Sequence, residues 1–436
     1  MKIIENFILA KTGSHNDNSG DCEVNIITLG CSKNLVDSEQ LAYQLEQNAF
    51  RVTHESSKPL PVTIINTCGF IQDATAQSVE MILDCAIEKV RGNIKQLIVM
   101  GCLSERYADD LLEEIPQIDA VFGVNAIEDI LKYLHATLSA ESITVRKIST
   151  PNHYAYLKVS EGCNQQCAFC AIPKIRGRQV SKPVELIRDE AIVLAEQGVK
   201  ELILVAQDLT HYGFDIYRKR KLYALLEELV KIKGIEWIRL HYLYPNFFQK
   251  DILDLMHDHS KICHYLDLPI QHIDDDILFS MNRKIASNDI RKLLDTIRNK
   301  VPDIAIRTTL IVGFPGETKA KFKHLCDFLQ ESQLDRVGVF PFSKEEDTPA
   351  YMLKETVSQR EKIRRAEELM AIQHDISSKK NKQKIGKTLK VLIDSEDEDF
   401  FTGRTEYDSP EVDNTVLIHK SGKDKNLTVG NFYNVT

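Results

Sequence analysis

Three cysteines lie close together in one segment, with three residues between Cys163 and Cys167 and two between Cys167 and Cys170. Three thiolates bind three irons of a four-iron cubane and leave the fourth iron open to a ligand, whereas a structural zinc site uses four protein ligands. No fourth cysteine follows nearby. The spacing therefore predicts a 4Fe-4S cluster with one open iron, and makes the chain a candidate enzyme. The alternatives are thiols that meet by chance in one loop, or a zinc site closed by a distant histidine.

A second set of cysteines follows strand-like segments in the first third of the chain. Cys31, Cys68 and Cys102 each come just after a β-branched run and next to a glycine. The carboxyl ends of parallel strands meet at one edge of a sheet, so these distant thiols are expected to converge. This placement predicts a second metal site, although free cysteines are more often small core residues. The remaining four cysteines are interpreted as small core residues: Cys22, Cys85, Cys263 and Cys326.

The elements that position the second set are predicted from alternating short apolar runs and amphipathic stretches, which indicate a parallel sheet wrapped by helices. The expected strands are Val24–Leu29, Val62–Asn66, Gln96–Met100 and Ala120–Phe122. The expected helices are Asn34–Gln47, Asp73–Val90, Glu105–Glu114 and Ala126–Leu138. Residues 23–140 are therefore expected to form an α/β domain of their own.

Six further strands alternate with helical patterns in residues 149–380, which predicts an incomplete (β/α)6 TIM-type barrel with one side open. These strands are Tyr154–Val159, Glu201–Ala206, Trp237–Leu243, Tyr265–Pro269, Ala305–Val312 and Asp335–Phe340. The loop with the three close cysteines follows the first of them, at the face where such barrels hold their active sites.

The end of the chain changes character. A charged run, Lys354–Lys384, predicts a solvated connector helix. Residues 381–436 then contain short strands separated by Gly, Asp and Asn, which predicts a small all-β barrel. The expected strands are Lys387–Ile393, Phe400–Thr405, Thr415–Ile418 and Phe432–Val435. The fold class is thus α/β and multidomain.

Composition excludes several classes of protein. The chain has 436 residues, 43% of them hydrophobic, and no apolar run long enough to span a bilayer. Its net charge of -9 argues against broad binding of DNA or another phosphate backbone. Residues 1–22 lack a signal-peptide pattern and are interpreted as a flexible leader, and ten cysteines without a secretory signal indicate the reducing cytoplasm.

The segment from Cys163 to Cys170 resembles the cluster motif of the radical S-adenosylmethionine (radical SAM) superfamily. Two further segments are similar to parts of that superfamily: Gln207 and Asp208 end the second barrel strand, and Gly313, Pro315 and Gly316 follow the fifth. The resemblance implies that these residues, together with Phe169 in the cysteine loop, contact S-adenosylmethionine. It also implies that the open iron chelates this cofactor and that reduction then yields a deoxyadenosyl radical.

The order of the three parts resembles that of the methylthiotransferase family: a three-cysteine domain, a radical SAM core and a C-terminal TRAM domain. The segment Leu29–Glu39, with Ser32–Asn34 after its first cysteine, is similar to the branch that modifies a ribosomal protein. The tRNA branch usually has Gln-Met-Asn there. Cys68 and Cys102 lie in segments that fit the same branch.

This resemblance implies two 4Fe-4S clusters and the addition of a methylthio group to the β-carbon of an aspartate in small-subunit ribosomal protein twelve. That C–H bond is too strong and too weakly acidic for acid–base chemistry, so a radical must remove the hydrogen. The cluster on Cys163, Cys167 and Cys170 would generate the radical. The cluster on Cys31, Cys68 and Cys102 would carry the sulfur. A low-potential electron donor and a sulfur donor are the other expected partners.

Charge offers an independent argument about the substrate. Between Ile385 and Thr436 there are six basic and ten acidic side chains, a net charge of -4. An RNA-binding barrel is expected to be basic, whereas the run Asp394–Asp399 suits a Lys- and Arg-rich protein. These acids could equally keep a loop solvated. Three alternatives stay open: a tRNA methylthiotransferase, a non-catalytic iron–sulfur scaffold, and an RNA-binding module with structural metals.

Overall fold

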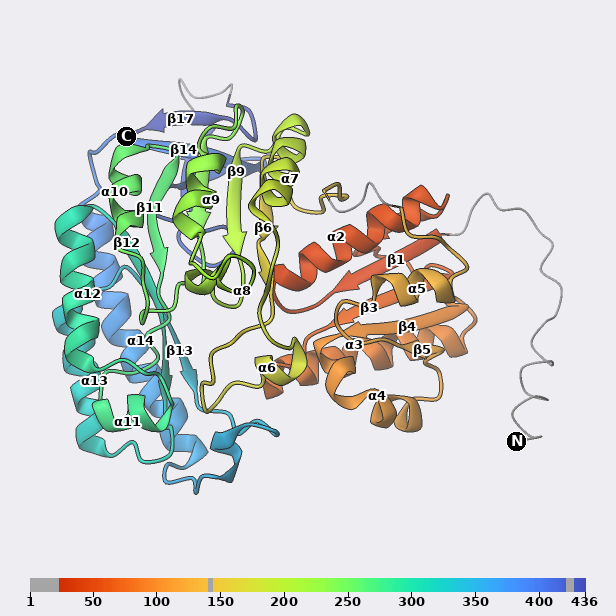
Figure 1. Ribbon diagram of the computed structural model, residues 1–436, viewed down its shortest axis with the longest axis horizontal. Coiled ribbons are helices and arrows are strands. Elements are labelled where there is room, and N and C mark those ends of the chain that lie inside the picture. The colour runs from red at the N-terminus through yellow and green to blue at the C-terminus, as the bar shows by residue number, and fades with distance from the viewer. Residues whose placement is uncertain (1–22, 140–143, 421–426) are drawn as a thin grey trace.

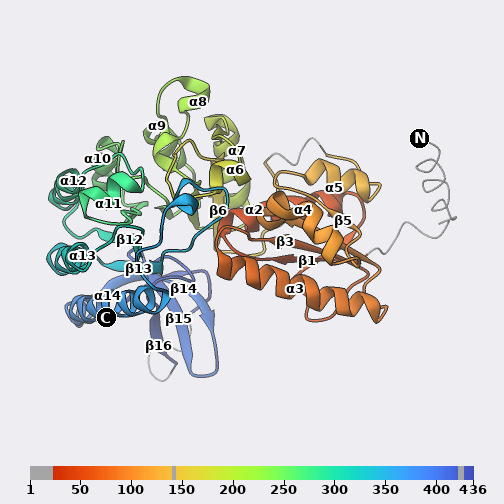
Figure 2. The ribbon, with the colours of Figure 1, turned by 90° about the horizontal axis from the view of Figure 1, so that it is seen from below.

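The computed structural model describes residues 23–139, 144–420 and 427–436, which form three packed parts (Figure 1). The N-terminal part lies beside the central barrel, and the C-terminal strands lie against another side of the barrel (Figure 2). The leader predicted for residues 1–22, including Cys22, lies outside the described residues. Across the described ranges, no helix combines the length and the apolar content needed to cross a bilayer.

The N-terminal part is a five-stranded parallel sheet with the strand order β2-β1-β3-β4-β5. Its strands are β1 (Glu23–Thr28), β2 (Arg51–His54), β3 (Val62–Thr67), β4 (Gln96–Gly101) and β5 (Ala120–Val121). The helices that cover it are α2 (Ser32–Gln47), α3 (Gln72–Val90), α4 (Cys102–Glu114) and α5 (Ile127–Tyr133). The four predicted strands are confirmed, and β2 is an addition at the sheet edge.

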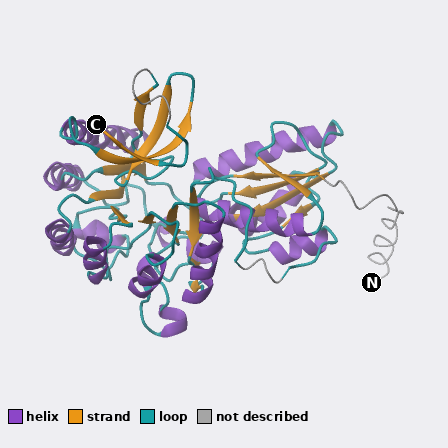
Figure 3. Cartoon of the chain, turned by 90° about the horizontal axis from the view of Figure 1, so that it is seen from above, coloured by secondary structure: helices purple, strands orange, loops and turns teal. Residues whose placement is uncertain are grey.

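Both faces of this sheet are covered, as the continuous apolar runs in the central strands require (Figure 3). One face packs on α2 and α5 through residues such as Leu41 and Ile130. The other packs on α3 and α4 through Ile82 and Leu111. The carboxyl ends of the strands, where the cysteines lie, therefore form one edge between two helical layers.

The central part is a six-stranded parallel sheet with the order β13-β12-β11-β10-β9-β6, and its two outer strands do not pair in the described residues. This confirms the open partial barrel. The strands are β6 (Tyr154–Lys158), β9 (Glu201–Val205), β10 (Trp237–Leu240), β11 (Ile262–Asp267), β12 (Ala305–Val312) and β13 (Arg336–Pro341). The outer helices are α7 (Val184–Glu196), α9 (Leu222–Leu229), α10 (Asp251–Asp258), α12 (Ser287–Lys300), α13 (Lys319–Ser332) and α14 (Gln359–Lys382).

Shorter elements lie mostly in the loops at the carboxyl ends of the barrel strands. They are the strand pair β7 (Ser160–Glu161) and β8 (Val180–Ser181), the helices α6 (Ile172–Ile175), α8 (Phe214–Tyr217) and α11 (Asp275–Ser280), and the 3-10 turns η2 (Leu209–His211) and η3 (Pro349–Met352).

Helix α14 corrects one expectation. The charged run was interpreted as a solvated connector, but α14 packs against β13 and α13 as the last helix of the barrel (Figure 1). Leu369 and Ile376 form its buried stripe. Arg365 is also buried, because its guanidinium pairs with Glu317 at 2.7 Å. The prediction was wrong because some charged residues of this helix, such as Arg365, are paired inside the protein and do not face solvent.

The C-terminal part is a curled four-stranded antiparallel sheet, a half-barrel with the order β16-β15-β14-β17. Its strands are β14 (Leu389–Glu396), β15 (Phe400–Thr405), β16 (Val416–His419) and β17 (Phe432–Val435). All four expected strands are present. Its small core contains Val391, Ile393, Phe401 and Ile418.

The loop after β15 contacts the inner face of the open barrel. Asp413 pairs with Arg307 on β12 at 2.6 Å and accepts a hydrogen bond from the Tyr265 hydroxyl on β11 at 2.8 Å. Asp408 pairs with Arg336 on β13. The Ser409 hydroxyl lies 3.0 Å from the His241 ring. The C-terminal part therefore closes the side of the barrel that its own strands leave open.

Candidate active site

The three N-terminal cysteines converge at the carboxyl edge of their sheet, as their positions predict. Cys31 precedes α2, Cys68 follows β3 and Cys102 begins α4. The Asn34 side-chain oxygen lies 4.0 Å from the Cys31 sulfur and 3.9 Å from the Cys102 sulfur. A Cβ placed on Gly30 would lie 2.8 Å from the Cys68 sulfur. Three thiols from three strand ends thus surround one small region.

Two glycines bring these thiols close together. Gly30 and Gly101 have φ values of +93° and +103°, in the region that side chains disfavour. A Cβ on Gly101 would lie 2.6 Å from the Thr67 carbonyl oxygen. Only glycine allows β4 to lead directly into α4 and to place Cys102 beside the end of β3.

The chemistry of these thiols fits a metal cluster. Burial raises the pKa of Cys102 to about 11 and also raises the pKa of Cys68. Such thiols remain protonated and unreactive at neutral pH unless a metal displaces the proton. The Arg176 guanidinium, which donates to the Asn34 side chain, places a positive charge beside the set. This charge would offset the negative charge of bound thiolates.

The second set, Cys163, Cys167 and Cys170, lies in the loop between β7 and α6. The Gln165 backbone N–H donates to the Cys163 sulfur at 3.3 Å, and the Cys170 N–H donates to the Cys167 carbonyl at 3.1 Å. Burial raises the pKa of Cys163 to about 12 and raises that of Cys170 further. Arg283 donates to the Cys167 sulfur at 3.3 Å, so this set also has a buried cation beside it.

Neither set has the geometry of a mononuclear metal site. In the part of the chain that the structure describes, no three His, Cys, Asp or Glu side chains are placed to hold a single metal ion. A cubane does not require this, because each thiolate binds a different iron atom. The donor sets fit two clusters, each with three protein ligands.

Gln207 is the best placed of the expected cofactor contacts. Both polar atoms of its amide are buried and lack any hydrogen-bond partner. Such a group is costly in a folded protein and points to a missing ligand. Asp208, by contrast, accepts hydrogen bonds from Gln165 at 2.9 Å and from the Thr210 backbone at 2.9 Å. The structure therefore favours Gln207 as a direct contact and Asp208 as the residue that orients Gln165.

The remaining expected contacts lie together around one apolar cluster. Phe169 packs with Ala168 and Phe314, which brings the cysteine loop against the Gly313–Gly316 turn. The N–H of Gly313 donates to Glu317, and that of Gly316 donates to Thr356 at 3.0 Å. Pro315 has no N–H to donate. These backbone donors are therefore satisfied within the protein, so this turn would contact a cofactor by shape or through carbonyl groups.

The two cysteine sets lie next to each other. Cys102 packs with Ala171, which directly follows Cys170, and with Ile175 at the end of α6. Arg176 then extends from the end of α6 to Asn34 and Asp37 on α2, and pairs with Glu161 at 2.8 Å. Sequence analysis did not single out Arg176 or Arg283. Asn34 lies in the family-like segment Leu29–Glu39, but that resemblance gives it no role, and no sequence pattern pairs it with Arg176, 142 positions away.

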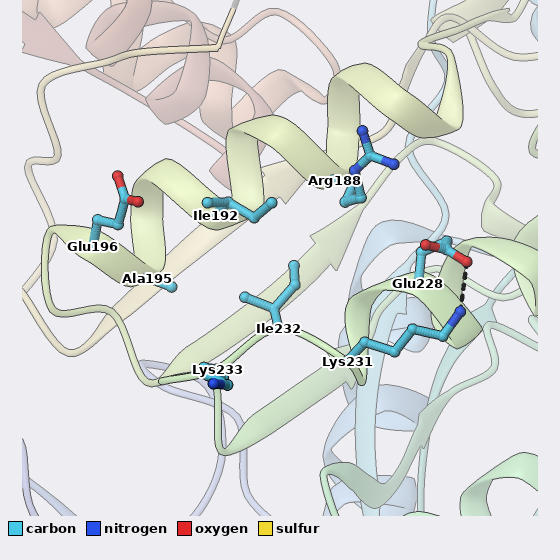
Figure 4. A pocket seen from close by; sticks show the side chains of 8 residues that line it. All are labelled: Arg188, Ile192, Ala195, Glu196, Glu228, Lys231, Ile232 and Lys233. Atoms are coloured by element: carbon cyan, nitrogen blue, oxygen red, sulfur yellow. Dashed lines mark hydrogen bonds and ion pairs between the residues drawn. The ribbon is translucent and has the colours of Figure 1, made fainter.

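A surface hollow lies elsewhere, between α7 and α9 (Figure 4). Lys231 and Glu228, paired at 2.7 Å, line one side of it, and Arg188 and Glu196 line the other. It lies near the carboxyl ends of these helices, which precede the next strands, so it belongs to the end of the barrel opposite the cysteines. No expected site residue lines it.

Family comparisons agree with the three-part architecture. Residues 157–329 match the Radical SAM superfamily, residues 23–123 match the uncharacterized protein family UPF0004, and residues 385–436 match the TRAM domain. Among solved structures, the methyltransferase TsrM from Kitasatospora setae aligns with a TM-score of 0.56 at 14% identity, covering 76% of this chain and 74% of TsrM. At that identity the likeness concerns the fold alone.

Curated relatives are much more similar. A protein from Cytophaga hutchinsonii named ribosomal protein uS12 methylthiotransferase RimO is 49% identical over 95% of this chain and 94% of its own length. Proteins of the same name from Flavobacterium psychrophilum and Bacteroides fragilis are 51% and 47% identical, covering 91% and 94% of this chain, and 91% and 95% of their own lengths. At this identity and coverage, the chain belongs to the RimO family of ribosomal protein uS12 methylthiotransferases.

Proposed function

We propose that this protein is a radical SAM methylthiotransferase that adds a methylthio group to the β-carbon of an aspartate in ribosomal protein uS12. The observation that carries the proposal is the pair of three-cysteine sets that meet across the contact of Cys102 with Ala171. One set alone would suit many radical enzymes. Two adjacent sets, each one ligand short of a closed site, suit a reaction that needs both a radical and a sulfur atom at one substrate carbon.

The residues that would hold each group follow from the geometry. Cys163, Cys167 and Cys170 would bind one 4Fe-4S cluster, and Cys31, Cys68 and Cys102 would bind the other. Gln207 would contact S-adenosylmethionine with its unpartnered amide. When bound, these groups supply a hydrogen-abstracting radical, a sulfur atom and a methyl group, which no side chain of the protein provides.

The protein's own side chains contribute orientation and charge. Arg176 and Arg283 would offset the negative charge of the two thiolate sets, one cation beside each. Asp208 holds Gln165 and thereby fixes the loop between Cys163 and Cys167. Four of the six cysteines, Cys68, Cys102, Cys163 and Cys167, are buried, which would keep water from a reactive radical.

We infer that the protein works in the cytoplasm, where its ribosomal substrate is made, and that it needs a low-potential one-electron donor and a source of sulfide. Neither donor is identified by a site in the described residues. The exposed acidic stretch Glu396–Asp399 would favour docking of a basic ribosomal protein.

The test is an anaerobic assay with reconstituted protein, S-adenosylmethionine and a reductant, in which uS12 and bulk tRNA are offered side by side. Mass spectrometry should find a methylthio group in place of one hydrogen on uS12 and no change on tRNA. A variant with Cys31, Cys68 and Cys102 all changed to Ala should lose one cluster's iron and all methylthio transfer. Modification of tRNA instead would establish the tRNA alternative, and absence of cofactor cleavage on reduction would establish a scaffold.

A further inference from the structure

Lys33 is a buried cation with an unusual partner. Only 6% of its surface is exposed, and its ammonium nitrogen lies 3.5 Å from the centroid of the Tyr242 ring. Apart from Tyr242, no hydrogen bond or ion pair joins it to any residue in the described ranges. A lysine ammonium has three donors, and the face of one ring does not satisfy them.

Other buried lysines of this protein show what is missing at Lys33. Lys158, at 4% exposure, pairs with both Asp37 and Glu161. Lys362, at 3% exposure, pairs with Glu355 and donates to the Phe342 carbonyl at 3.0 Å. Burying an ammonium costs roughly several kcal/mol unless an anion nearby compensates its charge. Lys33 therefore lacks the direct ion pair that this fold supplies to these two lysines: the buried carboxyl of Asp267 acts on it at longer range but forms no ion pair with it, and accepts a hydrogen bond from the Tyr242 N–H instead.

Lys33 lies between the two cysteine sets. It is two residues from Cys31, in the first turn of α2. Tyr242 comes just after β10, at the carboxyl edge of the barrel, and its carbonyl accepts a hydrogen bond at 3.0 Å from the N–H of Leu209, which follows Asp208. The ammonium thus reaches from the sulfur-carrying side of the site to the loop that holds the expected cofactor contacts.

Charge balance of the thiolates does not require Lys33. Arg176 already reaches Asn34 beside Cys31 and Cys102. Lys33 makes no hydrogen bond to either sulfur in the described residues, although it is close enough to Cys31 and Cys68 to act on them electrostatically, and its ammonium lies over the Tyr242 ring of the barrel. An anion that approaches from the barrel mouth could reach it without displacing a protein carboxylate.

We propose that Lys33 binds the side-chain carboxylate of the target aspartate and is a specificity-determining residue for the substrate. This inference rests on the proposed function. The carboxylate is bonded directly to the β-carbon, so a cation that holds it fixes the reacting C–H bond between the two cysteine sets. A charge-assisted hydrogen bond of this kind also distinguishes aspartate from its amide.

The experiment measures binding of two uS12 peptides to the anaerobically reconstituted protein, one with the target aspartate and one with asparagine in its place. Wild type should bind the aspartate peptide about 100-fold more tightly, the fold-change expected of a buried hydrogen bond to a charged group. Lys33→Met should lose this preference with its iron content unchanged, and Lys33→Arg should keep part of it. Lys231→Met, at an exposed lysine, is the matched control and should behave as wild type.

The outcomes separate the inference from the proposed function. If wild type modifies the aspartate peptide but binds both peptides equally, or if Lys33→Met keeps the preference, the inference is overturned. If Lys33→Met loses iron, the lysine serves the cluster and the inference is again overturned. If wild type modifies neither uS12 nor the peptide, the proposed function itself fails. The comparison of peptides on wild type holds even if the Met variant does not fold.

Discussion

At the scale of single residues, the expected cofactor contacts differ in how their polar atoms are satisfied. The amide of Gln207 is buried without a partner, whereas Asp208 and the Gly313 and Gly316 N–H groups are satisfied within the protein. An unpaired buried polar group destabilises the ligand-free fold by about 1–3 kcal/mol. Gln207 therefore carries a cost that a bound ligand would remove.

We predict that Gln207→Leu binds S-adenosylmethionine at least about tenfold more weakly while the ligand-free protein becomes no less stable. Equilibrium binding and thermal unfolding of the same preparations measure the two effects. Loss of stability with unchanged binding would show that the amide is satisfied internally and that another residue contacts the cofactor.

Asp267 is a buried carboxyl whose charge depends on pH. Burial raises its pKa to about 6, and Arg307 and the Tyr242 N–H offset this only in part. A carboxyl whose pKa rises on folding stabilises the folded state below its unfolded pKa, near 3.8, and that contribution is lost as the pH rises through about 6. At neutral pH Asp267 is ionised while buried, and this lowers the free energy of unfolding.

Asp267→Asn cannot ionise and keeps an oxygen for the Tyr242 N–H. We expect its free energy of unfolding, relative to wild type, to be about 2 kcal/mol greater at pH ~7.5 than at pH ~4, because a small part of the wild-type penalty is already present at pH ~4. Urea unfolding at a series of pH values checks this. A difference that stays constant with pH would show that the carboxyl titrates normally.

At the scale of elements, the sequence predicts what local patterns encode. β-Branched runs predict nearly every strand, and a cysteine after each of three parallel strands predicts their convergence, because strand ends meet at one edge. The short strand β2 escapes prediction, since Val52 is its one buried residue. Contacts between parts also escape, because no periodicity relates Arg176 to α2 or Lys33 to Tyr242.

Arg176 connects α6 to α2 through a buried ionic network. Burial would raise the pKa of Glu161, but Lys158 and Arg176 beside it lower this pKa to about 2. We predict that Arg176→Met destabilises the contact by about 2–3 kcal/mol, because Asp37 and Glu161 would each lose one of their two cations and keep Lys158. Hydrogen exchange should then rise in α2 and β6. If protection there is unchanged, packing of apolar side chains alone holds these elements together.

At the scale of the whole molecule, the acidic C-terminal part has two uses for its charge. Asp408, Asp413 and Asp394 are paired inside the protein, with Arg336, Arg307 and Arg404. Asp408 and Asp413 balance two arginines of the barrel, whereas Arg404 belongs to the C-terminal part itself and also pairs with Glu201 of the barrel. Part of the acidic charge of this part is thus used inside the protein. In the described residues, the exposed acids of this part are the run Glu396–Asp399, in which Glu396 pairs with Lys420 at 2.9 Å, and Glu411. The charge argument for a protein partner therefore rests on fewer acids than composition alone indicates.

The acids of the C-terminal part that are paired inside the protein and those that are exposed should respond differently to substitution. The first should affect stability, and the second should affect association with the substrate. Asp413→Ala should destabilise the barrel and the C-terminal sheet together by about 2–4 kcal/mol, because half-buried Arg307 and the buried Tyr265 hydroxyl would both lose their partner. Thermal unfolding should still show one transition, at a lower temperature.

The double variant Glu398→Gln, Asp399→Asn should unfold as wild type does, but associate with uS12 several-fold more slowly at low ionic strength. Since salt screens exposed charges, this difference should vanish at high salt. Slower association after Asp413→Ala alone, or a loss of stability in the double variant, would show that the assignment of inner and outer acids is wrong.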